Sequence, residues 1–138
     1  MQYNRYMGID YGKARIGIAF SDLSGTIASA HSVIKGQGEK DVENLSNLAK
    51  SMDVKYIVIG LPLNADGTES EMSKFVQDFG KKLSEKSGLQ VFYQDERYTS
   101  FEAEEYLKEA GIKWEKRKEL LDKVSAQIIL QNYLDERK

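Results

Sequence analysis

Three short segments near the N-terminus carry the alternating hydrophobic and polar pattern of β-strands. They are separated by turn-forming residues, and they cover Arg5–Asp10, Arg15–Ser21 and Ile27–Ile34. Their close succession predicts an antiparallel meander. In the second segment, bulky side chains alternate with glycine, alanine and serine, so one face of the sheet should let another element approach closely.

The next part of the chain changes between helical and extended patterns. Apolar residues at helical spacing between Val42 and Met52 precede KYIVIGL, an almost entirely apolar stretch that predicts a strand buried on both faces. The segment Thr68–Glu71 has the form of a capping box that starts a second helix, and Gly88 should end that helix. Leu89–Tyr93 then predicts a fifth strand.

Two further helices complete the pattern. A second capping box at Thr99–Glu102 should open a helix that ends at Gly111, and the last helix should cover roughly Arg117–Glu136. This order predicts an α/β fold with a five-stranded mixed sheet flanked by helices on both faces. Because 138 residues are close to the usual size of one domain, we expect residues 1–138 to form a single domain.

The composition restricts the possible chemistry. The chain has no cysteine and one histidine, His31, which excludes disulfides, thiolate metal sites and histidine-rich sites, so any metal must bind oxygen ligands. The sequence shows neither a signal-peptide pattern nor an apolar stretch long enough to span a bilayer, so we expect a cytoplasmic protein without a membrane partner. With a net charge of −2, any contact with nucleic acid must use a local cluster of positive charge.

Three carboxylates occupy positions where they could form an active site. Asp10 and Glu96 each follow a predicted strand, at the sheet edge where ligands bind in α/β proteins, although an aspartate there also commonly starts a turn. Asp122 shares a helical stripe with residues that should face the sheet. A buried charge needs a partner, which could be a basic residue such as Lys118 or Lys123, but a metal shared by all three carboxylates explains more.

Carboxylates that converge without histidine or cysteine favour Mg²⁺ or Mn²⁺, because these ions prefer oxygen ligands. Two such ions about 3.5–4 Å apart would activate a water molecule and stabilise the leaving oxygen of a phosphodiester. Hydrolysis of nucleic acid is therefore the chemistry that the pattern favours.

Four motifs in order, GIDYGKARIGIAFSD, IGLPLNADGTES, QDERYTSFEAE and KRKELLDKVSAQIILQNYL, resemble the YqgF (RuvX) family. The resemblance implies a ribonuclease H-like fold similar to RuvC-type Holliday junction resolvases, and the activity of a candidate nuclease for the 5′ end of pre-16S ribosomal RNA. By motif position it assigns Asp10, Glu96 and Asp122 as catalytic and metal-binding residues. A fourth carboxylate, usual in related resolvases, stays open between Asp95 and Glu119.

Contacts to nucleic acid are predicted at two places. By resemblance, Arg97 would orient the site or meet a phosphate, although a salt bridge to Asp95 or Asp10 explains it nearly as well. A basic run next to Trp114 precedes the last helix, where a solvated charged face is an equal alternative. Tyr98 and Trp114 could stack on unpaired bases. The predicted nucleic-acid-binding residues are Arg97, Lys116, Arg117 and Lys118.

The sequence favours a single-stranded ribosomal RNA precursor as substrate, since one short basic run offers few phosphate contacts, and ribosomal particles are possible partners. A resolvase acting on four-way DNA and a non-catalytic nucleic-acid or ribosome-binding module are the alternatives. The N-terminal motif is also similar to the first phosphate motif of actin-like ATPases, but those proteins need two facing domains. Both a monomer and a homodimer remain open.

Overall fold

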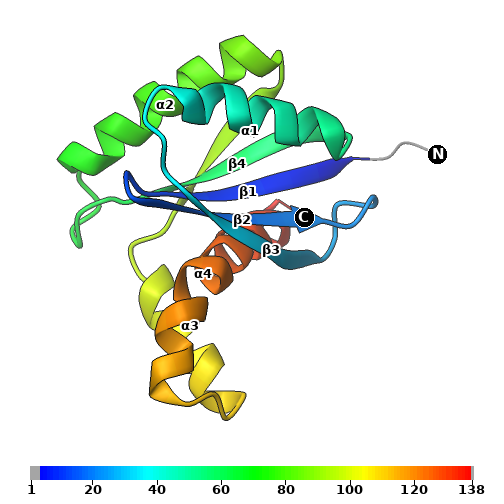
Figure 1. Ribbon diagram of the computed structural model, residues 1–138. Helices are drawn as coiled ribbons and strands as arrows, with labels where there is room; N and C mark the ends of the chain where they lie inside the picture. Colours follow the sequence, from blue (N-terminus) through cyan, green and yellow to red (C-terminus); the bar gives the residue numbers. More distant parts are fainter. Residues whose placement is uncertain (1–3, 138) are drawn as a thin grey trace.

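Five strands form one mixed sheet in the computed structural model, which describes residues 4–137 apart from the side chains of Lys118 and Glu119 (Figure 1). The spatial order is β3-β2-β1-β4-β5, in which β1, β2 and β3 are antiparallel and β4 and β5 run parallel to β1. The predicted meander and mixed sheet are confirmed. The strands are β1 (Arg5–Tyr11), β2 (Arg15–Ser21), β3 (Ala28–Lys35), β4 (Val54–Leu61) and β5 (Gln90–Asp95).

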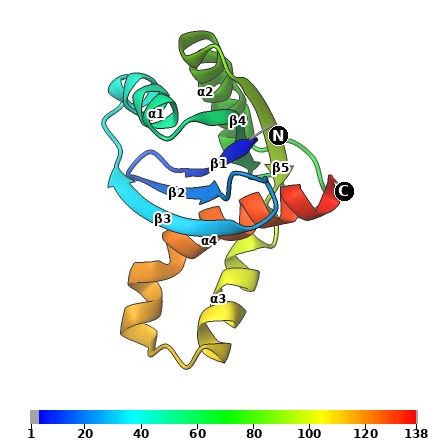
Figure 2. The same ribbon diagram turned by 90° about the vertical axis from the view of Figure 1, so that its right-hand side faces the viewer.

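Helices cover both faces of the sheet, as predicted. Helices α1 and α2 lie on one face and α4 crosses the other, while α3 packs on α4 and projects with it away from the sheet (Figure 2). No helix within the described residues is long and apolar enough to cross a membrane. The helices are α1 (Lys40–Ser51), α2 (Glu71–Ser87), α3 (Thr99–Glu109) and α4 (Trp114–Glu136).

The predicted capping boxes of α2 and α3 are wrong, and so is the predicted start of α4, whereas α3 begins at Thr99 as expected. Helix α2 is capped by Ser70, whose hydroxyl accepts a hydrogen bond from the Ser73 amide while the Ser73 hydroxyl accepts one from the Ser70 amide. The Thr68 hydroxyl belongs instead to the preceding loop, where it donates to Asp66 and accepts a hydrogen bond from the Asn64 side-chain amide. Helix α3 has no side-chain cap, and α4 begins one turn before the predicted start.

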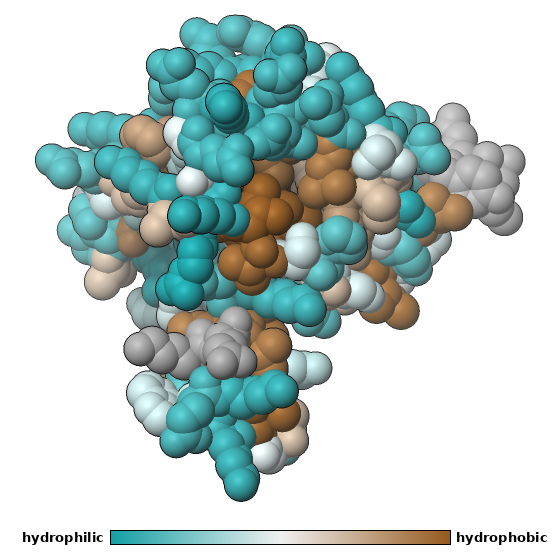
Figure 3. All heavy atoms as spheres, viewed as in Figure 1, coloured by the Kyte–Doolittle hydropathy of each residue, from teal (hydrophilic) through white to brown (hydrophobic). Residues whose placement is uncertain are grey.

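The two faces of the sheet differ in the size of their side chains. The face toward α1 and α2 is bulky, and part of it stays visible as hydrophobic surface between α1 and β3 (Figure 3). The face toward α4 carries glycine and alanine at its centre, as the alternation in β2 predicted. The buried bulky side chains of β1, β2 and β4 on the α1 and α2 side are Met7, Ile9, Tyr11, Ile16, Ile18, Phe20, Val54, Ile57 and Ile59.

Glycine allows α4 to lie almost in backbone contact with the sheet. A Cβ atom added to Gly17 would overlap the backbone carbonyl oxygen of Asp122, and one added to Gly8 would come within 2.7 Å of the Leu130 Cβ. Such distances are too short for any real Cβ atom, so no larger residue fits without a shift of the helix. The close contact brings Asp122 directly over the β1–β2 pair.

We expect Gly17→Ala to lower the free energy of unfolding by about 1–3 kcal/mol, because the new methyl group must push the α4 backbone away from the sheet. Urea denaturation would measure this change. The control is Ser29→Ala at an exposed position of β3, which should stay within about 0.5 kcal/mol of the parent chain. Equal stability of Gly17→Ala and the parent chain would contradict the close approach.

Candidate active site

Asp10 and Glu96 meet at the carboxyl ends of β1, β4 and β5. Asp10 pairs across the ladder with Gly17, so its side chain lies on the face covered by α4. Glu96 directly follows β5, and its amide still donates to the carbonyl of Leu61 in β4, at 3.2 Å. Its carboxyl lies across β4, because a Cβ atom on Gly60 would stand 2.7 Å from the Glu96 Oε2.

The carboxyl groups of Asp10 and Glu96 share a hydrogen bond. Burial raises the pKa of Asp10 to about 6, and the charge of Asp122 adds to the effect. Burial also raises the pKa of Glu96 to about 8, and the nearby Asp10 charge reinforces it. Two buried like charges repel, so Glu96 keeps its proton and donates it to the Asp10 carboxylate.

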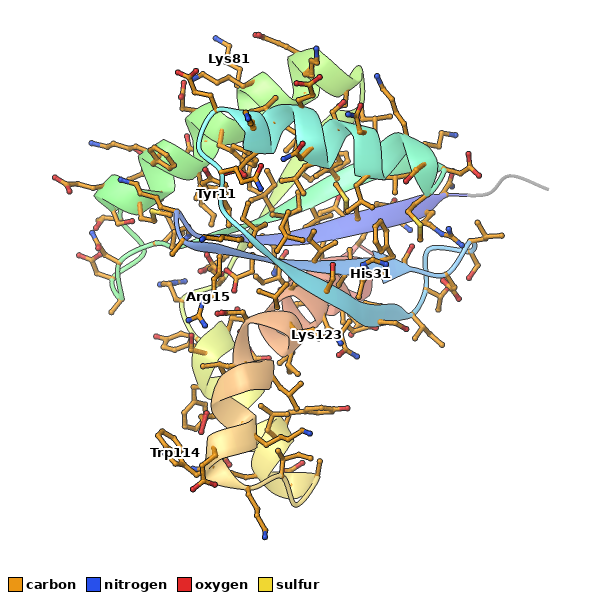
Figure 4. All side chains as sticks on the ribbon, viewed as in Figure 1. Tyr11, Arg15, His31, Lys81, Trp114 and Lys123 are labelled. Atoms are coloured by element: carbon orange, nitrogen blue, oxygen red, sulfur yellow. The ribbon has the colours of Figure 1, made fainter. Side chains whose placement is uncertain are left out.

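Asp122 is held by a residue that the sequence analysis did not single out. The Arg15 Nε lies 3.2 Å from the Asp122 Oδ2, and the Asp122 side chain is 33% exposed, so it lies at the rim of the site. Figure 4 shows Arg15 on the α4 side of the sheet. The alternation in β2 contained the signal, because it places Arg15 on the same face as Gly17. This basic partner of Asp122 comes from β2. Lys123 forms no salt bridge with Asp122 in the described part of the structure, and the Lys118 side chain lies outside that part.

A proton and a guanidinium group balance the negative charge of the three carboxylates. Within residues 4–137, no three histidine or carboxylate side chains stand together closely enough to hold one metal ion. Asp10 and Glu96 instead share a proton, and Asp122 pairs with Arg15. A divalent cation that replaced both would meet oxygen ligands only, which is the donor set that Mg²⁺ and Mn²⁺ prefer. The donor atoms therefore fit such an ion by type, and the three carboxylates would have to move closer together to hold it.

Arg97 has the salt bridge that the sequence analysis kept as an alternative. Its Nε and Nη2 atoms both lie 2.8 Å from the Asp95 Oδ2, and its Nη1 donates to the carbonyl of Ala65 at 3.1 Å. Arg97 thus ties the β4–α2 loop to the turn after β5. Asp95 is thus occupied by its ion pair with Arg97.

The basic run in the first turns of α4 contains residues with different surroundings. Arg117 is largely buried, lies 3.3 Å from Glu104 of α3 and donates to the carbonyl of Ile112. It therefore helps to close the α3–α4 hairpin. Lys116 is exposed, whereas the side chains of Lys118 and Glu119 lie outside the described part of the structure. Two aromatic side chains that could stack on bases are well exposed, Tyr98 and Trp114.

Comparison with known proteins agrees with this arrangement. The family model RuvX, described as a Holliday junction resolvase, matches residues 4–136. The chain belongs to the RuvX family. A relative from Syntrophomonas wolfei, named as a candidate pre-16S rRNA nuclease, is 45% identical over 95% of this chain and 94% of its own length. A relative of the same name from Endomicrobium trichonymphae is 46% identical over 96% of both chains.

The fold of this RuvX family member is also found in a solved structure. RuvC from T. thermophilus, determined in complex with a Holliday junction substrate, superposes with a TM-score of 0.59 and covers 98% of this chain and 96% of its own. The sequence identity is 12%, so this likeness concerns the fold. The ribonuclease H-like fold implied by the motifs is confirmed.

We expect the metal-free protein to lose stability as the pH rises from about 4 to about 8. The folded chain keeps protons on Asp10 and Glu96 that the unfolded chain releases, because burial raises the pKa of both groups. The stabilisation is complete below the pKa that these carboxyl groups have in the unfolded chain. At higher pH it falls by up to about 1.4 kcal/mol per pH unit for each proton that the folded chain holds and the unfolded chain has released. Urea denaturation in EDTA at a series of pH values would measure this slope.

The variant Glu96→Gln should flatten that slope, because its amide replaces the protonated carboxyl without titrating. The exposed Asp78→Asn provides the control and should keep the parent slope. A parent slope retained in Glu96→Gln would show that the proton is held elsewhere.

Proposed function

We propose that this chain is a divalent-metal-dependent endonuclease that hydrolyses phosphodiester bonds, with the 5′ end of a pre-16S ribosomal RNA as substrate. The observation that carries the proposal is the burial of the Asp10 and Glu96 carboxyls together at one sheet edge, with Asp122 close enough to raise the pKa of Asp10. Membership of the RuvX family and the names of its relatives support a nuclease. A ribosomal RNA substrate would place the protein in the cytoplasm. We also propose that residues 1–138 form a single domain.

Asp10, Glu96 and Asp122 are the proposed catalytic and metal-binding residues. Mg²⁺ or Mn²⁺ bound by them would supply the activation of water and the stabilisation of the leaving oxygen. Glu96 would hold the cation as a carboxylate without its proton, and Asp122 would hold it in place of Arg15, because the charge of the ion would balance both groups. The released Arg15 side chain is exposed and charged, so it can turn toward a phosphate of the substrate.

The proposed nucleic-acid-binding residues have different tasks. Lys116 is exposed and would contact a phosphate directly, and Lys118 is proposed from its place in the same basic run. Arg97 and Arg117 fix the loops and the hairpin around the site through their ion pairs, so their effect on binding would come mainly from positioning.

A single RNA strand suits this surface better than two crossing duplexes. The net charge is −2, and duplex binding usually draws on many phosphate contacts. Exposed aromatic residues beside the site, above all Tyr98, favour unpaired bases. One observation favours a second candidate: the family description names a Holliday junction resolvase, an activity that would require two copies to make paired cuts.

We expect Asp10→Asn, Glu96→Gln and Asp122→Asn each to reduce metal-dependent cleavage by at least about a hundredfold, because each removes a ligand charge. Cleavage of a pre-16S RNA fragment and of a four-way DNA junction should be compared at one Mn²⁺ concentration and one salt concentration. The parent chain should cut the RNA. The Glu85→Gln variant is the control, since it removes an exposed carboxylate outside the candidate active site and should cleave like the parent.

Parent-like cleavage by any of the three variants would remove that residue from the active site. Paired nicks in the DNA junction with the RNA intact would replace the ribosomal substrate by a junction. Binding of the RNA without any cleavage, under conditions where Mn²⁺ is bound, would favour a ribosome-associated binding module.

We expect Arg15→Gln to bind Mn²⁺ up to about fivefold more tightly than the parent, because the metal no longer has to break an exposed ion pair with Asp122. A titration of the substrate-free protein followed by electron paramagnetic resonance would measure the affinity. Arg15→Lys keeps the positive charge and should stay close to the parent. Weaker Mn²⁺ binding by Arg15→Gln would mean that Arg15 organises Asp122 for the metal.

A further inference from the structure

A cleft of about 490 Å³ lies on the opposite face of the sheet from the candidate active site, at the same end of β1. It is enclosed by the first turn of α1, the middle of α2 and the last residue of β1, Tyr11. Figure 4 shows Tyr11 on the side of the sheet that faces α1 and α2, whereas Arg15 lies on the other side. Because Tyr11 directly follows Asp10, the cleft and the carboxylates are separated only by the edge of the sheet.

Three nearly parallel aromatic rings line this cleft. The rings of Tyr11 and Phe79 stack with their centroids 4.0 Å apart and their planes 14° apart, and Phe75 lies at 5.8 Å from Tyr11 with an angle of 18°. Val42 completes the apolar wall. Phe75 stays 40% exposed, although it belongs to the apolar stripe of α2. The cleft therefore offers flat apolar surface in one orientation, which suits a planar ring.

The rim of the cleft carries charges of both signs. The Lys13 ammonium lies 4.7 Å from the centroid of the Phe75 ring, and Lys13 belongs to the β1–β2 turn that separates the cleft from Asp10. Lys82 pairs with Asp78 at 3.1 Å on the α2 side, and Glu39 borders the α1 side. A ligand with a flat ring, hydrogen-bond donors on its edge and an attached phosphate would match all of these groups.

We propose that this cleft binds one unpaired base of the nucleic-acid substrate, close to the phosphodiester that is cut. The inference rests on the proposed nuclease function and adds to it a site that reads the strand beside the cut. Phe75 would stack on the base once Lys13, whose ammonium lies over that ring, turns to the phosphate as the strand passes over the β1–β2 turn. Glu39 would accept a hydrogen bond from an exocyclic amino group, which favours adenine, cytosine or guanine over uracil.

The test uses a short single-stranded RNA that carries one 2-aminopurine, added to the full chain in EDTA so that cleavage cannot occur. Stacking quenches the fluorescence of this base, so the parent chain should quench it on binding. Phe75→Ala should bind about tenfold more weakly and lose most of the quenching, whereas Phe75→Tyr keeps the ring and should restore both. Tyr106→Ala, which removes a similarly exposed aromatic side chain of α3, is the matched control and should bind like the parent.

Each outcome separates this inference from the proposed function. Parent-like affinity and quenching in a folded Phe75→Ala variant would overturn the base-binding cleft but leave the nuclease proposal intact. If Tyr98→Ala lost both affinity and quenching, the stacking side chain would be Tyr98 at the start of α3. If the parent chain bound no RNA, the proposed function and the cleft would both be overturned. Thermal melting of each variant confirms that the loss of quenching reflects the ring and not unfolding.

Discussion

The contact between α4 and the glycine-rich face of the sheet determines where the chemistry can occur. The α4 backbone at Asp122 touches the position where Gly17 lacks a side chain, and the same glycine pairs with Asp10 across the β1–β2 ladder. Gly60 plays the matching part on β4, where it leaves room for the Glu96 carboxyl. A larger side chain at either glycine would separate carboxylates that come from β1, β5 and α4, so these small residues set the geometry of the site.

Bringing acidic groups together has an electrostatic cost that the fold must compensate. Burial and mutual repulsion raise the pKa of Asp10 and Glu96, and the pair keeps a proton that each group alone would release in water near pH 7. Asp122 lies at the rim, where Arg15 balances its charge. A compact divalent cation would remove the repulsion at all three positions, which is why a metal-free protein with this arrangement retains both a proton and an ion pair.

Patterns that depend on side-chain alternation were predictable from the sequence. The period of two in β2 separated its bulky residues from Gly17, and the strand ends placed Asp10 and Glu96 at one edge. Contacts that depend on the three-dimensional fold were not. The Thr68 hydroxyl does not cap α2, because it bonds to Asp66 and Asn64 within the loop. Arg117 of α4 pairs with Glu104 of α3, and this contact exists only because the two helices fold back on each other. The Arg15–Asp122 pair joins residues far apart in the chain, so local reasoning searched only the neighbours of Asp122.

Adjacent residues of a strand point to opposite faces of the sheet, so the last two residues of β1 face different sites. Asp10 faces α4 and the other carboxylates, whereas Tyr11 faces α2 and stacks with Phe79. A flexible single strand can bend around the narrow β1–β2 turn and reach both faces at once, but a stiff duplex cannot follow so tight a curve. If both proposals hold, the alternation of side chains at the end of β1 would connect cleavage on one face to base binding on the other, and this arrangement would favour unpaired nucleic acid over duplexes.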